Sequence, residues 1–189
     1  MTTSLAPAVR SVVLVGWVLL AVGSPLQAQS GKDAATLADF RQRLGAYVAL
    51  QQKLQATLPK LPADARPDQY IDRQRALARL IQSARIGARP GDIVTRRMRD
   101  LLRARLQETF RGPDGRQVRA GLFDEYTGTF RATINGSYPE DAPVSSMPPQ
   151  VLRALPDLPQ PIEYRFIDKK MILFDKDARL IVEIVEKVL

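Results

Sequence analysis

The last part of the chain constrains the fold most, because apolar and polar residues alternate there in three short runs. From Ile162 to Val185 the sequence reads IEYRFIDKKMILFDKDARLIVEIV, and charged turns separate the runs at Asp168-Lys169 and at 175–178. Alternation at every second position is typical of a strand with one buried face. Asp168-Lys169 is a two-residue hairpin candidate, weaker than Asn-Gly because lysine disfavours positive φ. We predict a three-stranded antiparallel meander.

A fourth strand is predicted upstream of this meander. TFRATING, from Thr129, is typical of a strand over Thr129 to Ile134 that is closed by Asn135-Gly136. The proline-rich surface connection SYPEDAPVSSMPPQ follows, and a proline near its end suits the first position of one or two helical turns within 147–155. We expect the fourth strand to join the sheet.

The preceding region has helical periodicity instead. A first helix starts with Asp33 as a possible N-cap and ends at LPKLPADARP, a second runs from about Asp68 to GARPGD, and a third begins at Asp92 or Thr95 and ends at RGPDG. Three- and four-residue steps define their apolar stripes. The stripes comprise Leu37, Phe40, Leu44, Tyr47, Leu54 and Leu58 in the first helix, Ile71, Leu77, Leu80, Ile81 and Ala84 in the second, and Val94, Met98, Leu101, Leu102 and Leu106 in the third.

Charge changes where the secondary-structure pattern changes. Residues 29–120 contain 19 Lys and Arg against 9 Asp and Glu, whereas residues 121–189 contain 8 against 11. We therefore predict a basic helical region over 29–120 and a small antiparallel β region with a proline-rich connection over 121–189. The expected fold class is α+β: a helical hairpin or three-helix layer followed by a three- to four-stranded antiparallel sheet.

The first 28 residues have the pattern of a secretory signal peptide. Arg10 is their only charge, an apolar run extends from Val12 to Val22, and the small residue Ala28 offers a cleavage site. The run of about 11 residues is shorter than the roughly 20 that a membrane span needs. A cleaved signal and a periplasmic or secreted location are predicted, with no transmembrane span after cleavage. Retention of the segment as an anchor is the alternative.

The composition excludes several classes of site. The chain contains no cysteine and no histidine, which excludes disulfides, Cys/His zinc sites, histidine-bound copper or nickel, Ser-His-Asp triads and cysteine nucleophiles. We predict no catalytic activity, no cofactor and no metal. An enzyme that uses only carboxylates, Lys, Ser or Tyr stays open as a third class.

The densest acidic cluster is predicted to be structural. Asp175, Asp177 and Glu183 lie close together, but a calcium loop needs oxygen ligands at several alternate positions and usually a glycine for the bend. Here two acids are followed by an apolar strand. Nothing in the spacing places two carboxylates across a cleft, as glycoside hydrolysis requires.

The arginines of the second and third helices are the candidate binding surface. A field of one sign raises the local concentration of anions, although a solvated helix face is the simpler interpretation. The expected partner is an anionic envelope component or an acidic protein. Nucleic acid is not expected, because single-strand platforms mix aromatic and basic residues and the aromatic residues here lie in the acidic region. The candidate residues are Arg73, Arg79, Arg96, Arg97, Arg99 and Arg103.

Three motifs resemble a family of uncharacterised bacterial exported proteins. They are ARPGDIVT at 88–95, INGSYP at 134–139 and the ending from Leu155 to Ile184. This chain departs from the family pattern at Asp168-Lys169, Glu183 and Arg96. The resemblance implies export and a fold, and no activity. The last 30 or so residues are also similar, more loosely, to periplasmic nickel and cobalt homeostasis proteins, but no metal role transfers to a chain without histidine.

The alternative function is helix-mediated assembly. The apolar stripe from Leu37 to Leu58 could form a homodimer seam or pair with a partner helix, although Gln51 occupies a core position of its heptads. Light scattering of the exported protein at several concentrations tests the homodimer. A mass that does not change with concentration and equals that of one chain removes it.

Overall fold

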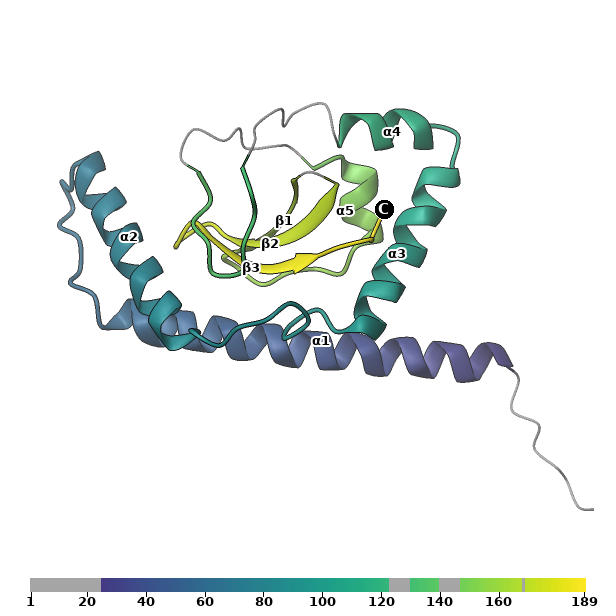
Figure 1. The fold of residues 1–189 in the computed structure, drawn as a ribbon, viewed down its shortest axis with the longest axis horizontal. Helices are drawn as coiled ribbons and strands as arrows, with labels where there is room; N and C mark the ends of the chain where they lie inside the picture. Colours follow the sequence, from purple (N-terminus) through teal and green to yellow (C-terminus); the bar gives the residue numbers. More distant parts are fainter. Residues whose placement is uncertain (1–24, 123–129, 140–146, 168) are drawn as a thin grey trace, which may run out of the picture.

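The helices come first in the chain and the sheet comes last (Figure 1). The computed structural model describes residues 25–122, 130–139, 147–167 and 169–189, so most of the predicted signal peptide lies outside the described residues. The α+β class, with a small antiparallel sheet after the helices, is confirmed. The elements are α1 (Pro25–Ala56), α2 (Pro67–Ala84), α3 (Arg96–Arg111), α4 (Gly115–Gly121), α5 (Pro149–Ala154), β1 (Ile162–Ile167), β2 (Lys170–Asp175) and β3 (Leu180–Val185).

Helix α1 is the longest element, and it packs its apolar stripe within its own molecule. It runs along one side of the sheet, with α2 and α3 on either side of the strands (Figure 1). Phe40, Leu44 and Tyr47 are buried in the main core cluster. The helix begins before Asp33, so the prediction of Asp33 as its N-cap is wrong; Asp33 instead accepts a hydrogen bond from the Gln29 side chain at 3.2 Å. The central part of the predicted dimer seam is therefore covered by this chain.

The helices after α1 end near the predicted breaks, and one helix is present that was not predicted. Thr95 is the N-cap of α3, and its hydroxyl accepts a hydrogen bond from Met98 N at 3.4 Å. RGPDG ends α3 as predicted, but the unpredicted helix α4 follows at once. Gly115 allows the start of α4 to lie close to the end of α3, because a Cβ at this position would lie 2.0 Å from the carbonyl oxygen of Phe110.

The three strands form the predicted meander, in the order β1-β2-β3 with both pairs antiparallel. Ile167 pairs with Lys170 across the two-residue turn, and Lys169 takes the positive φ of 61°. Asp168 lies outside the described residues. A bulge between Leu173 and Phe174 shifts the register against β3.

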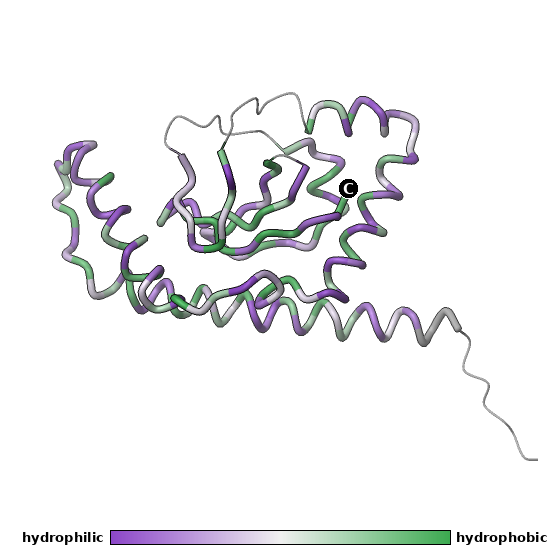
Figure 2. Tube along the Cα trace, in the orientation of Figure 1, coloured by the Kyte–Doolittle hydropathy of each residue, from purple (hydrophilic) through white to green (hydrophobic). Residues whose placement is uncertain are grey.

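Both faces of the sheet are buried, so the prediction of a single buried face is wrong. The helices cover one face, which carries Tyr164, Leu173 and Val182. Residues 130–139 cover the other, where Tyr138 packs with residues such as Phe174 and Ile181. Figure 2 shows hydrophobic residues concentrated in the strands, in contrast to the largely hydrophilic α3.

The predicted fourth strand does not form over 130–134, and Thr129 lies outside the described residues. The chain turns instead: Gly136 N donates to Thr133 O at 2.9 Å, and Asn135 has φ of 59°. This turn prevents extended pairing of the residues before it. Backbone contact with β3 begins in the turn itself, where Asn135 N donates to Ile181 O at 2.8 Å and Gly136 O accepts from Ile181 N at 2.9 Å, and Ser137 forms an isolated bridge with Leu180.

One core joins the basic and acidic regions. The main cluster combines side chains of α1, α2 and α3 with those of α5 and all three strands. The change in net charge near residue 120 is therefore a property of the surface, because the buried residues on both sides of it pack together.

A buried hydrogen bond links α1 to the sheet. The hydroxyl of Tyr47 donates to Asp175 Oδ2 at 2.7 Å, and Asp175 Oδ1 accepts from the backbone N–H groups of Asp177 and Ala178 at 2.9 and 3.0 Å. Tyr47 is 4% exposed and Asp175 is fully buried. Both oxygens of the carboxylate thus have partners, as a buried charge requires.

We expect Tyr47→Phe to lower the free energy of unfolding by about 1–3 kcal/mol, because it leaves Asp175 Oδ2 buried without its donor. Urea denaturation measures the change. Tyr70→Phe is the matched control: Tyr70 is 55% exposed, and its substitution should change stability by no more than about 0.5 kcal/mol. Equal effects of the two variants would contradict a role for this hydrogen bond.

Candidate functional site

The first turns of α3 present arginines to solvent because the buried stripe takes the intervening positions. Met98 and Leu102, four residues apart, are buried against the sheet side of the molecule. Arg96 and Arg97 are exposed and Arg99 is half-buried. Residues at these offsets cannot share the face of Met98 and Leu102.

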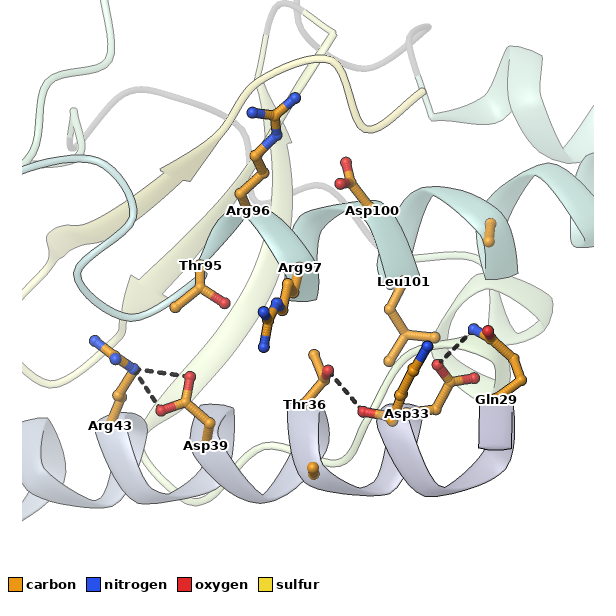
Figure 3. A pocket seen from close by; sticks show the side chains of 13 residues that line it. Gln29, Asp33, Thr36, Asp39, Arg43, Thr95, Arg96, Arg97, Asp100 and Leu101 are labelled. Carbon is orange, nitrogen blue, oxygen red and sulfur yellow. Dashed lines mark hydrogen bonds and ion pairs between the residues drawn. The ribbon is translucent and has the colours of Figure 1, made fainter. Parts of the chain in front are cut away.

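Arg97 lies in a groove between α1 and α3. Figure 3 shows its side chain directed toward α1, whereas the side chain of Arg96 points to the opposite side of α3. This α1–α3 groove has a volume of about 1020 Å³, and its charges almost balance. Its charged lining residues are Lys32, Arg43, Arg96 and Arg97 against Asp33, Asp39 and Asp100.

Neighbouring residues already engage several charges of the α1–α3 groove. Arg43 Nε donates to both carboxylate oxygens of Asp39 at 2.9 and 3.0 Å, and its Nη1 donates to the Asp92 carbonyl at 3.1 Å. These contacts fasten α1 to the loop before α3. With four cations against three acids, the charged lining residues leave this groove a net charge of only +1.

A second groove lies on the other side of α3, and we call it the basic groove. Its volume is about 690 Å³, and cations from three separate segments line it: Arg96 and Arg99 from α3, Arg131 from the 130–139 segment and Lys170 from the start of β2. Glu186 is the one acidic residue among its described lining residues. Of the predicted site residues, Arg96 and Arg99 lie here.

Two of the four cations in the basic groove lack an acidic partner in the described part of the chain. Lys170 Nζ forms an ion pair with Glu186 Oε1 at 3.3 Å. Arg99 Nε forms an ion pair with Asp100 Oδ1 at 3.6 Å, which is too long for a hydrogen bond, and no described residue supplies this Nε with a hydrogen-bond acceptor. Arg96 and Arg131 are exposed and form no ion pair with a described residue. The groove thus concentrates positive charge that the fold itself leaves unneutralised.

The other predicted arginines lie elsewhere. Arg73 donates to the carbonyls of Pro59 and Gln55, so it holds the loop between α1 and α2. Arg103 donates to the carbonyl of Lys187 and fastens the C-terminal residues to α3. Arg79 is exposed on α2 and lines neither groove. The structure therefore brings Arg96 and Arg99 together in the basic groove, directs Arg97 into the α1–α3 groove, and separates Arg73, Arg79 and Arg103 from both.

Sequence reasoning missed two lining residues, Arg131 and Lys170. Both belong to the acidic region, and each lies far along the chain from α3. A motif search has no signal for them, because only the packing of 130–139 over the sheet brings Arg131 to the groove.

Glu183 of β3 holds the loop that forms one wall of the basic groove. Its buried carboxylate accepts hydrogen bonds from the backbone N–H groups of Gly91, Ile93 and Val94, at 3.1, 2.9 and 3.2 Å. Gly91 has φ of +96°, a conformation that favours glycine. Gly91 and Val94 both line the groove. Glu183 lies within β3 and not in a turn, unlike Asp177, which follows β2.

The hydrogen-bonded pair of Tyr47 and Asp175 is closed to solvent, because both side chains are buried. Burial raises the pKa of Tyr47 well above its ordinary value, and the neighbouring Asp175 carboxylate adds to this.

Among the described residues no group of three or more His, Cys, Asp or Glu could hold a metal ion. None of the helices described is long and apolar enough to cross a membrane.

Comparisons with protein-family models, with curated proteins and with solved structures gave no match.

The buried carboxyl of Glu183 should make stability depend on pH. Burial raises its pKa above the ordinary 4.5, although its backbone donors oppose the shift. A raised pKa in the folded state means that folding favours the protonated form, so this contribution to stability falls as pH rises from 4.5 through the raised pKa. We expect the stability of the wild type relative to Glu183→Gln to be highest at acidic pH and to decline toward neutral pH.

Urea denaturation of both proteins between pH 4.5 and 8 measures this difference. Glu108→Gln, at an exposed position of α3, is the control for removal of a carboxylate that the fold does not bury. If the stability of the wild type relative to Glu183→Gln rises with pH, the backbone donors outweigh burial and the pKa is lowered instead.

Proposed function

We propose that the protein is an exported, non-catalytic binding module of the bacterial envelope that holds an anionic partner in the basic groove. The observation that carries the proposal is the composition of this groove: Arg96, Arg99, Arg131 and Lys170 face a single described acid, Glu186. Charges gathered at a concave surface attract an anion more strongly than the same charges spread over a helix.

Two further features support this function. The signal-like segment at residues 1–28 supports export. The absence of histidine and cysteine from the sequence, together with the burial of the Tyr47–Asp175 pair, supports a role in binding rather than in catalysis. The partner is an anionic envelope component or an acidic protein.

The structure sharpens which arginines should matter. Arg96 and Arg99 line the basic groove, whereas the side chain of Arg97 is directed into the nearly balanced α1–α3 groove. Loss of Arg96 and Arg99 should therefore weaken binding more than loss of Arg97 alone.

The test is a pull-down of envelope fractions with the exported protein. We expect the variant with Arg96, Arg97 and Arg99 all changed to Ser to lose at least 80–90% of the captured partner, about a tenfold fall in affinity or more. High salt should release the partner from the wild type, because 1 M salt shortens the screening length to about 3 Å. Arg97→Ser alone should retain most of the binding.

A variant with the same loss of charge serves as the control. Arg41, Arg79 and Arg116 are exposed and line neither groove, so their joint substitution by Ser removes three charges and should leave binding largely intact. Retention of the partner by the Arg96/Arg97/Arg99 variant in high salt contradicts the proposed function. Equal losses in the two triple variants would assign binding to net charge rather than to the groove.

A further inference from the structure

Apolar residues line the basic groove together with its cations. They are the half-buried Ala132, Ile134 and Ile184, which we call the apolar floor, and the exposed Pro90. A site for a simple inorganic anion would need only donors and charge. Apolar surface in a charged groove is instead stabilised by contact with another apolar group.

The sheet supports this floor rigidly. Ala132 and Ile184 pack against the cluster of Tyr138, Ile172 and Ile181 on the second face of the sheet. On the other side of the groove, Glu183 holds the 91–94 loop through its backbone hydrogen bonds. The apolar floor and one cationic wall are thus fixed before any ligand arrives, which lowers the entropic cost of binding.

The cations line the same groove. Arg96 comes from α3 and Arg131 from the 130–139 segment, and both are exposed. A guanidinium group can donate two parallel hydrogen bonds to a phosphate or carboxylate. One acidic group held between the walls would satisfy both arginines, and an attached chain could lie over Ile134 and Ile184.

We propose that the basic groove binds an amphiphilic anion, a phosphate or carboxylate head group on a short apolar chain. This inference rests on the proposed function and specifies its ligand. The groove volume of about 690 Å³ lies within the range of about 300–1,000 Å³ for small-molecule sites. An acidic peptide would satisfy the cations but would leave the apolar floor without a partner.

Isothermal titration of the exported protein with three probes tests the inference. Octyl phosphate carries both groups, inorganic phosphate carries only the charge, and octyl glucoside carries only the apolar chain. We expect octyl phosphate to bind at least about tenfold more tightly than either of the others. Binding of inorganic phosphate or octyl glucoside as tight as that of octyl phosphate overturns the inference.

Two variants separate the contributions of charge and floor. Ile134→Ser should weaken octyl phosphate binding about tenfold and leave the weak binding of inorganic phosphate unchanged. Joint substitution of Arg96 and Arg131 by Ser should weaken both ligands. Ala132→Glu, which places a carboxylate on the floor, should abolish octyl phosphate binding and serves as a second variant if Ile134→Ser unfolds by circular dichroism. Unchanged octyl phosphate binding in the folded floor variants overturns the inference.

The same titrations distinguish failure of this inference from failure of the proposed function. If hexaglutamate binds more tightly than octyl phosphate and the arginine variant loses it, the groove recognises acidic peptides: the inference is wrong and the proposed function stands. If no anion binds and the pull-down does not depend on Arg96 and Arg99, both are wrong.

Vesicle binding identifies the source of the ligand. Binding to phosphatidylglycerol vesicles, with none to phosphatidylcholine vesicles, would identify a membrane lipid. Binding to octyl phosphate alone would identify a free amphiphile, and either result supports the inference.

Discussion

The contact between the Glu183 carboxylate and the backbone of residues 91–94 is the constraint on which the groove depends. It places a charge inside the sheet, where it would be costly without donors, and it satisfies that charge with backbone N–H groups of the loop before α3. The loop therefore has one position relative to β3, and the first turn of α3 follows it. Since that turn carries Arg96 and Arg99, a buried acid determines where these two cations lie.

Two other polar side chains act in the same way. Buried Asp175 joins β2 to α1 through Tyr47. Half-buried Arg85, just after α2, donates to Asn135 Oδ1 at 2.8 Å and to Val182 O of β3 at 3.2 Å. Both side chains contact a segment far away in the sequence. The arginine-rich composition thus serves two purposes: some arginines bind carbonyl or amide oxygens within the fold, and others remain at the surface with their charge unneutralised.

The sequence predicted much of the fold because short-range patterns determine it. The period of two over 162–185 specified the meander, and Thr95 specified the start of α3 through its side-chain oxygen. The prediction for 129–134 was wrong because strand propensity competes with the turn at Thr133 to Gly136. The prediction of a single buried face was wrong because alternation identifies which residues share a face and does not show that a second layer covers the other face.

The sequence by itself determined the order of elements, the hairpin positions, the excess of basic residues in the first region and the lack of histidine and cysteine chemistry. These properties depend on residue type and on neighbours a few positions away. Only the tertiary structure decided which arginines are structural, which are free, and that Arg131 and Lys170 join Arg96 and Arg99 in one groove. Those outcomes depend on packing between distant segments, because a side chain becomes a structural donor or a free charge according to the acceptors that the fold brings near it.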